Sequence, residues 1–181
     1  MDTWVMKREP RTRPDRLVDS YREVTPDLLR DLGRSVLLLD VDSTLGPHGS
    51  SRPEPEVVEW AEVLRKHGIR CFVVSNGGHR RMAVFCGALE VPFIARAGKP
   101  SPAAVRKGLS ILGAAPEDAA FLGDQLYTDI RCAGNAGVLS ILTAPVSCHE
   151  PLNVRCKRWF ERRTLRRILT RDEQSHWSRP L

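Results

Sequence analysis

The chain has 181 residues, of which 41% are hydrophobic and 28% are charged, a balance that suits one compact domain and excludes a disordered or fibrous protein. No apolar run approaches the roughly 20 residues of a membrane-spanning helix, the start has no apolar signal core, and five scattered cysteines without a CxxC pair fit a reducing compartment. We therefore expect a cytoplasmic protein, and the net charge of +6 indicates an anionic partner.

The two ends differ in composition from the middle of the chain. Residues 1–16 are rich in Arg and Pro and are expected to be a flexible basic segment. Residues 17–33 predict an ordered lead-in with a helix starting near Thr25 and Pro26. From Ser35 to Ala144, apolar strand-like runs alternate with helical patterns, which predicts parallel strands joined by crossover helices in an α/β domain over 17–146. Residues 147–181 predict a basic helical tail.

The alternation begins with Val36–Leu39, whose continuous apolar run is typical of a central parallel strand buried on both faces. Further strands are expected at 69–74, 93–95, 119–122 and 138–142. Helices are expected between them: one introduced by Pro53 and Pro55 and ending near Gly68, one from about His79 to Leu89, and one starting at Ser101.

Polar residues follow four of these strands, namely Asp40 and Asp42, Ser75 and Asn76, Lys99, and Asp124 and Asp129. Ligands of open α/β sheets bind beyond the carboxyl ends of the strands, so we expect these side chains to meet at one edge. Each residue alone is more often a turn or cap residue than a catalyst. The four groups in this order predict an active site.

Phosphoryl transfer needs a nucleophile, a proton donor and positive charge. An Asp-x-Asp pair at a strand end provides the first two, because one carboxylate can attack phosphorus while the other moves protons. Lys99 provides an ammonium, and the Ser75 hydroxyl can hold phosphoryl oxygens. Mg²⁺ prefers oxygen ligands, and a site for it is expected from Asp40, the main-chain carbonyl of Asp42, Asp124 and Asp129.

Four stretches carry a family resemblance: Asp40-Val-Asp-Ser-Thr-Leu, Val74-Ser75-Asn76, Gly98-Lys99-Pro100, and Gly-Asp-Gln-Leu-Tyr-Thr-Asp over 123–129. They resemble the four signatures of the haloacid dehalogenase superfamily. This resemblance implies a Rossmann-like three-layer sandwich. It also implies the roles of single residues: Asp40 as the nucleophile, Asp42 as the general acid and base, Thr44, Ser75 and Asn76 in binding the substrate, Lys99 as the neutralising cation, and Asp124 and Asp129 as metal carboxylates.

A narrower resemblance rests on Val24-Thr25-Pro26, on Ser75-Asn76-Gly-Gly-His-Arg-Arg, on Val91-Pro92-Phe-Ile and on the acidic segment 123–129 followed by Gly134-Asn135-Ala-Gly. These residues resemble the YqeG branch of the superfamily, over about residues 17–146. The branch is similar to mitochondrial phosphatidylglycerophosphate phosphatases. The resemblance therefore implies a lipid head-group phosphate as one hypothesis for the substrate.

The spacing of the motifs leaves no room for a sizeable cap domain, because the stretches from Asp42 to Ser75 and from Ser75 to Lys99 are each filled by one helix and one strand. An uncovered site admits phosphate on a bulky carrier, although a small soluble phosphometabolite is the alternative. The tail from Asn153 to Arg171 mixes many arginines with aromatic and aliphatic residues. We weigh two roles for it, peripheral contact with the inner face of the membrane and packing on the domain.

Two other classes of protein share parts of this pattern. A receiver domain also gathers acidic residues, a hydroxyl and a lysine, but its lysine follows the hydroxyl strand near the end of the domain, whereas Lys99 precedes Asp124. A non-catalytic scaffold that binds anionic macromolecules is opposed by the retention of every reactive carboxylate. No signature of specific nucleic-acid binding accompanies the positive charge.

Overall fold

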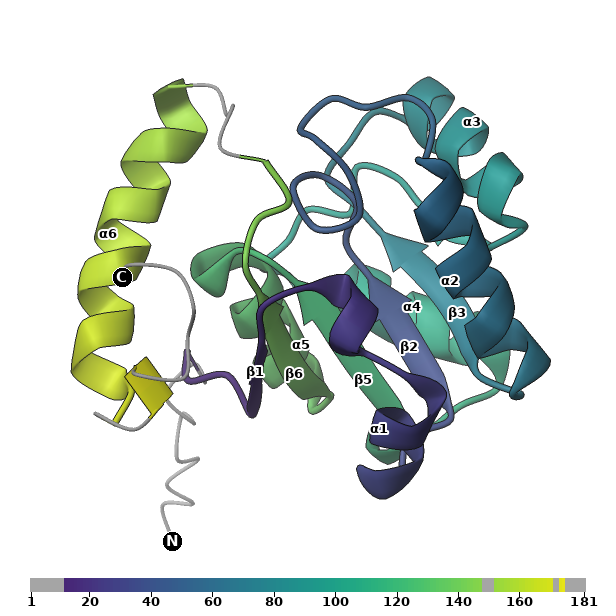
Figure 1. The fold of residues 1–181 in the computed structure, drawn as a ribbon, viewed down its shortest axis with the longest axis horizontal. Helices are drawn as coiled ribbons and strands as arrows, with labels where there is room; N and C mark the ends of the chain where they lie inside the picture. The colour runs from purple at the N-terminus through teal and green to yellow at the C-terminus, as the bar shows by residue number, and fades with distance from the viewer. Residues whose placement is uncertain (1–11, 148–151, 171–172, 175–181) are drawn as a thin grey trace, which may run out of the picture.

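The computed structural model describes residues 12–147, 152–170 and 173–174. Their core is a sheet with the strand order β1-β6-β5-β2-β3-β4, in which every neighbouring pair is parallel (Figure 1). The strands are β1 (Arg16–Val18), β2 (Val36–Leu39), β3 (Arg70–Val74), β4 (Phe93–Ile94), β5 (Ala119–Gly123) and β6 (Leu139–Thr143). The predicted α/β class with a central parallel sheet is confirmed.

Helices cover both faces of the sheet (Figure 1). The helices of the described residues are α1 (Pro26–Asp31), α2 (Pro55–Lys66), α3 (His79–Leu89), α4 (Ala103–Leu112), α5 (Arg131–Ala136) and α6 (Leu152–Ile168), of which α6 lies beside the edge of the sheet. Thr25 accepts a hydrogen bond from the Leu28 N–H and caps α1, as its place before Pro26 predicts. The predicted helix at 79–89 has the bounds of α3, and the helix predicted from Ser101 begins two residues later, at Ala103.

Strand β2 is apolar at every position because both of its faces are covered by helices. Leu37 and Leu39 pack in one cluster with residues of α2 and α3, whereas Val36 and Leu38 pack in another with residues of α4 and α5. All four side chains are fully buried. A strand that is covered on both faces has no solvent-facing position for a polar residue, so the three layers explain the run Val36–Leu39.

The edge strand β1 corrects the predicted boundary between a flexible segment over 1–16 and the domain. Arg16–Val18 pairs in parallel with β6, and the Asp15 carboxylate accepts hydrogen bonds from the Ser140 N–H at 2.9 Å and its hydroxyl at 2.7 Å. A three-residue strand is too short to show a period of two, so only its partner β6 reveals it. Residues 1–11 of that segment lie outside the described residues.

The described stretch between Asp42 and Lys99 contains no inserted cap domain, which agrees with the prediction for this stretch. Every residue between 41 and 98 is described, and the helices and strands in this stretch are α2, β3, α3 and β4. The basic tail forms α6 beside the edge made by β1 and β6 (Figure 1). Residues 148–151, 171–172 and 175–181 of the predicted tail lie outside the described part. Within the described part, none of the helices has both the length and the apolar character that crossing a membrane requires.

Candidate active site

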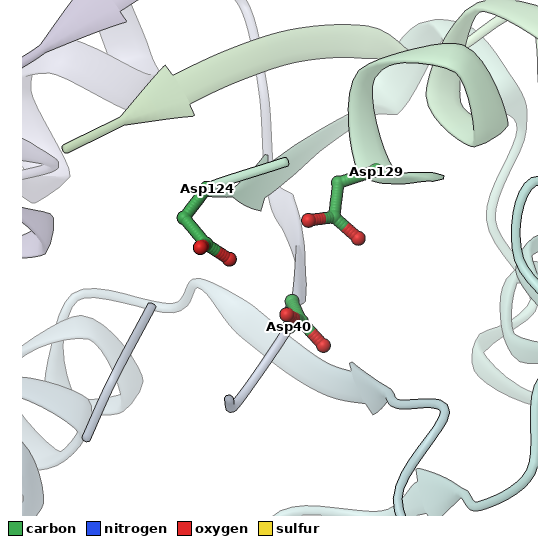
Figure 2. A group of neighbouring side chains, drawn as sticks. All are labelled: Asp40, Asp124 and Asp129. Carbon is green, nitrogen blue, oxygen red and sulfur yellow. The ribbon is translucent and has the colours of Figure 1, made fainter. Parts of the chain in front are cut away.

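Three carboxyl groups converge beyond the carboxyl ends of β2 and β5 (Figure 2). Asp40 directly follows β2, Asp124 directly follows β5, and Asp129 lies in the π-helical turn Leu126–Ile130. One oxygen atom from each carboxyl group lies within 4.8 Å of the others, and all three residues are buried. The structure therefore brings together the side chains of three of the residues predicted to hold a cation.

Lys99 joins two of these carboxyl groups. Its Nζ lies 2.6 Å from Asp40 Oδ1 and 2.7 Å from Asp129 Oδ1, and its side chain is 2% exposed. Burial alone lowers the pKa of a lysine, but the adjacent Asp129 and Asp40 carboxylates raise the pKa of Lys99 above its usual value. The ammonium therefore stays charged beside Asp40.

Asp42 points to a different partner. Its carboxylate forms two hydrogen bonds with the Arg81 guanidinium, at 2.9 Å and 2.5 Å, and accepts a third from the Gly49 N–H at 2.8 Å. Burial raises the pKa of Asp42, but these hydrogen bonds outweigh burial and lower it below its usual value. Arg81 also donates to the main-chain oxygen of Ser50 at 3.1 Å, so it ties α3 to the loop that follows Asp42. The Asp42 carboxylate is thus bound by Arg81 and Gly49 and is not one of the three that lie within 4.8 Å of one another, and its main-chain carbonyl as a cation ligand stays a prediction.

Two predicted substrate-binding residues hold other parts of the site in place. The Thr44 hydroxyl donates a hydrogen bond to Asp124 Oδ1 at 2.8 Å. Asn76 pairs with the main chain of Lys99, where its Oδ1 accepts from the Lys99 N–H at 3.0 Å. Ser75 is fully buried, and its Oγ accepts from the Gly77 N–H at 3.0 Å. In these contacts Thr44 and Asn76 position Asp124 and Lys99, and the predicted substrate contacts of all three residues stay untested.

Helix α6 adds two side chains that the sequence analysis did not assign to the site. Arg158 forms an ion pair with the Asp124 carboxylate, and its Nη1 donates to the main-chain oxygen of Asp124 at 2.6 Å. Glu161 lies 3.8 Å from Arg158 and accepts a hydrogen bond from the Tyr127 N–H at 3.1 Å. Arg158 and Glu161 are 9% and 4% exposed. The tail therefore packs against the site.

Among the described residues, the site buries more acidic than basic side chains. Four acidic residues, Asp40, Asp124, Asp129 and Glu161, face two buried cations, Lys99 and Arg158. The pKa of Asp40 is raised to about 8 and that of Asp124 to about 6. Burial is the largest cause of both shifts, and neighbouring carboxylates add to them. Lys99 lowers the pKa of Asp40 and Arg158 lowers that of Asp124, but neither outweighs burial. A divalent cation would relieve this repulsion, and an all-oxygen donor set suits a hard cation such as Mg²⁺.

The missed residues differ in how much the sequence says about them. Arg81 lies in the first turn of the helix that follows Ser75, so a charged residue facing the site was a local possibility. Arg158 lies 34 residues after Asp124 and is one arginine among many in the tail. Nothing in the local sequence distinguishes Arg158 from its exposed neighbours.

Comparison with known proteins agrees with this geometry. A family model described as haloacid dehalogenase-like hydrolase matches residues 8–137. The chain is also similar to the probable phosphatase YqeG of Bacillus subtilis (strain 168), with 33% identity over 152 residues, which are 84% of this chain and 88% of that protein.

Solved structures of low sequence identity share the fold. The cobalt-bound deoxy-D-mannose-octulosonate 8-phosphate phosphatase of Haemophilus influenzae has a TM-score of 0.51 and 14% identity, with 75% of this chain and 89% of that chain covered. A hydrolase of Legionella pneumophila described as putative and as subfamily III A of the superfamily has a TM-score of 0.50 and 17% identity, with 67% and 71% covered.

Proposed function

Because the chain belongs to the haloacid dehalogenase-like hydrolase family and is a phosphatase, we propose that it hydrolyses phosphate monoesters through a phosphorylated Asp40. The observation that supports this most is the position of the Asp40 carboxylate. It is buried at the end of β2, 2.6 Å from the Lys99 ammonium, and shares an acidic cluster with Asp124 and Asp129. A nucleophile, a fixed positive charge and a set of cation ligands thus lie together, as phosphoryl transfer requires.

In the proposed first step, an Asp40 oxygen attacks phosphorus and the bond from phosphorus to the leaving oxygen breaks, while Asp42 gives that oxygen a proton. In the second step, water attacks the acyl phosphate, Asp42 accepts the proton, and phosphate and the Asp40 carboxylate are released. The hydrogen bonds from Arg81 lower the pKa of Asp42 against the effect of burial. They therefore favour the carboxylate form, which accepts a proton from water in the second step, and the proposed cycle needs Asp42 to carry that proton into the first step of the next turnover.

The acidic cluster is proposed to hold Mg²⁺, with Asp40, Asp124 and Asp129 contributing oxygen atoms. When bound, the cation would offset negative charge on the phosphoryl oxygens. Lys99 supplies positive charge next to Asp40, and Ser75 offers its hydroxyl to the phosphoryl group. These roles are consistent with the burial of every charged group in the cluster.

The mechanism is tested with Asp40→Asn, which removes the nucleophilic oxygen and keeps the shape of the side chain. We expect the variant to fold and to lose turnover of an aryl phosphate, whereas the exposed Asp27→Asn keeps it. Asp124→Ala should bind Mg²⁺ much more weakly, and excess chelator should stop the wild-type enzyme. Comparable turnover by Asp40→Asn, or full activity in chelator, would contradict the proposal.

For the substrate, we propose a phosphate monoester on an anionic lipid, of the phosphatidylglycerophosphate type. Its supports are the uncapped sheet edge and the outer face of α6, where Trp159 and Phe160 are 61% and 57% exposed and lie beside exposed arginines. Basic residues near an anionic membrane contribute about 1 kcal/mol each, and aromatic side chains enter the interface. This face would place the protein at the inner surface of the membrane.

The lipid assignment is tested by replacing Arg162, Arg163 and Arg167, all exposed on α6, with Gln. Activity on lipid phosphate in anionic vesicles should fall, activity on a soluble aryl phosphate should stay, and added salt should reproduce the loss for the wild type. Equal loss on both substrates would mean that these arginines support the fold. Hydrolysis of a small sugar phosphate with no turnover of lipid phosphate would favour the soluble phosphometabolite instead.

A further inference from the structure

One charged side chain of α6 reaches the candidate cation site from outside the residues that the family model matches. The family model matches residues 8–137, and Arg158 lies beyond them. Its guanidinium is buried against Asp124, where Nη1 donates to the main-chain oxygen at 2.6 Å and Nη2 pairs with Oδ2. Arg158 therefore contacts both the backbone and the carboxylate of the same residue.

The rest of α6 holds Arg158 in this position. Leu165 and Leu169 form a buried cluster with Leu126, Ile130 and Leu142, and Glu161 accepts a hydrogen bond from the Tyr127 N–H at 3.1 Å. These contacts join α6 to the π-helical turn Leu126–Ile130, which follows Asp124 and carries Asp129. The helix is thus attached to the chain segment that presents two of the three acidic side chains.

Both oxygen atoms of the Asp124 carboxylate have a partner. Oδ1 accepts a hydrogen bond from the Thr44 hydroxyl at 2.8 Å, and Oδ2 pairs with Arg158. Donors on opposite ends of a carboxylate fix its plane, and each oxygen keeps a second lone pair that can be given to a cation. The side chain of Asp124 is fully buried, so in this structure its oxygen atoms rely on protein donors and not on solvent.

We propose that Arg158 is a positioning residue for the cation site, which sets divalent-cation affinity by fixing the orientation of the Asp124 carboxylate. This inference rests on the proposed function, since it needs Asp124 to be a cation ligand. It makes α6 a working part of the active site, although the helix lies outside the family core.

Arg158 also acts in the opposite direction, because a positive charge next to a cation ligand repels the cation. Two features reduce this repulsion. Glu161 lies 3.8 Å from Arg158, and the guanidinium spreads its charge over contacts with the main-chain oxygen and the carboxylate of Asp124. Removing a partner of a ligating carboxylate typically costs 10–100-fold in metal affinity, so the loss of orientation is expected to exceed the relief of repulsion.

The test measures binding of Mn²⁺ alone to the full chain, by titration calorimetry and by the electron paramagnetic resonance signal of free Mn²⁺. Arg158→Gln should weaken binding by roughly 10-fold or more. Arg158→Lys should recover part of the affinity, since an ammonium keeps the charge but has no fork of donors. Arg162→Gln, an exposed change on the same helix, should leave it unchanged. Circular dichroism in chelator checks the fold, and Arg158→Lys carries the test if the Gln variant does not fold.

Unchanged affinity in Arg158→Gln, or equal affinity of the Lys variant and the wild type, would overturn the positioning role. Tighter binding would overturn it in favour of competition between Arg158 and the cation. A wild type that binds Mn²⁺ no better than Asp124→Asn would overturn the cation site of the proposed function and the inference with it. Failure of the positioning role and failure of the cation site are distinguishable. If only the positioning role fails, the wild type still binds Mn²⁺ more tightly than Asp124→Asn.

Discussion

At Gly123 the absence of a side chain lets Asp129 lie against the end of β5. A Cβ atom at this position would be 2.4 Å from Asp129 Cβ and 2.7 Å from its Oδ2. Asp129 Oδ2 accepts the hydrogen bond of the Gln125 N–H at 3.0 Å, so a shift of Asp129 also disturbs the turn that follows Asp124. The glycine is required here by close packing and not by an unusual backbone angle.

We predict that Gly123→Ala destabilises the protein by about 1–3 kcal/mol, the usual cost of overpacking, and weakens cation binding because Asp129 is displaced. Urea unfolding in chelator measures the first effect, and Mn²⁺ titration measures the second. The matched control is Gly87→Ala in α3, where the added Cβ meets nothing within 4 Å. This change is expected to raise the free energy of unfolding by about 0.5–1 kcal/mol. Equal stability of the two variants would contradict this account of Gly123.

Arg81 acts on Asp42 and on the loop that follows it. The Arg81 hydrogen bond is the largest influence that lowers the pKa of Asp42 against burial, so Arg81→Gln should raise the pKa of Asp42. Amide exchange at Gly49, whose N–H donates to Asp42, should become faster because the loop also loses the contact from Arg81 to Ser50. Carboxyl-carbon NMR titration and hydrogen exchange provide the measurements. Arg80→Gln, an exposed neighbour, should change neither, and an unchanged pKa in Arg81→Gln would show that other contacts control Asp42.

At the scale of elements, α6 is held by its apolar side. Leu165 is 7% exposed and packs on Leu126, Ile130 and Leu142, whereas Phe160 is 57% exposed on the other side of the helix. The sequence left two roles open for this tail, membrane contact and packing on the domain. One face of α6 packs on the domain, and Trp159 and Phe160 are exposed to solvent. The proposed membrane contact concerns that outer face alone.

We predict that Leu165→Ala lowers the free energy of unfolding by about 2–5 kcal/mol, the range for buried leucines, and weakens cation binding through the displaced Arg158. Phe160→Ala should change the free energy of unfolding by less than about 0.5 kcal/mol. Urea unfolding followed by circular dichroism separates the two variants. A similar small effect for both would indicate that α6 adds little to the folded state.

At the scale of the whole molecule, the buried acidic groups of the site make both cation binding and the free energy of unfolding depend on pH. In the cation-free protein the pKa of Asp40 is raised to about 8, that of Glu161 to about 7 and that of Asp124 to about 6, with burial as the largest cause of each. An acid whose pKa is higher in the folded than in the unfolded state binds more protons when folded. The cation-free stability contributed by these groups therefore falls as the pH rises from about 4 toward 8.

We expect the melting temperature in chelator to fall between pH 5.5 and pH 8, and the increase produced by Mg²⁺ to grow over the same range, since the cation competes with protons for the carboxylates. Differential scanning calorimetry with and without Mg²⁺ checks both trends. In Asp40→Asn the fall in chelator should be shallower, because one of the titrating groups is gone. A Mg²⁺ effect that stays constant with pH would argue against binding at this cluster.

The family signatures and the alternation of strands and helices were readable from the sequence for physical reasons. Val36–Leu39 is apolar at every position because it is covered on both faces, and the residues after each strand meet because parallel strands end at one edge. Asp40, Lys99, Asp124 and Asp129 therefore came together in the structure as their places after the strands predicted.

The sequence by itself thus determined the α/β class, the order of the strands from β2 to β6 with helices α2, α3 and α4 between them, and the convergence of Asp40, Asp124 and Asp129 with Lys99. Tertiary structure alone decided the rest: the pairing of β1 with β6, the turn of Asp42 toward Arg81 and the insertion of Arg158 beside Asp124. The physical reason is the range of the interactions. Periodicity and strand ends are set by neighbours in the chain. Arg158 contacts Asp124 because Leu165 and Leu169 pack on Leu126, Ile130 and Leu142, which lie far away in sequence.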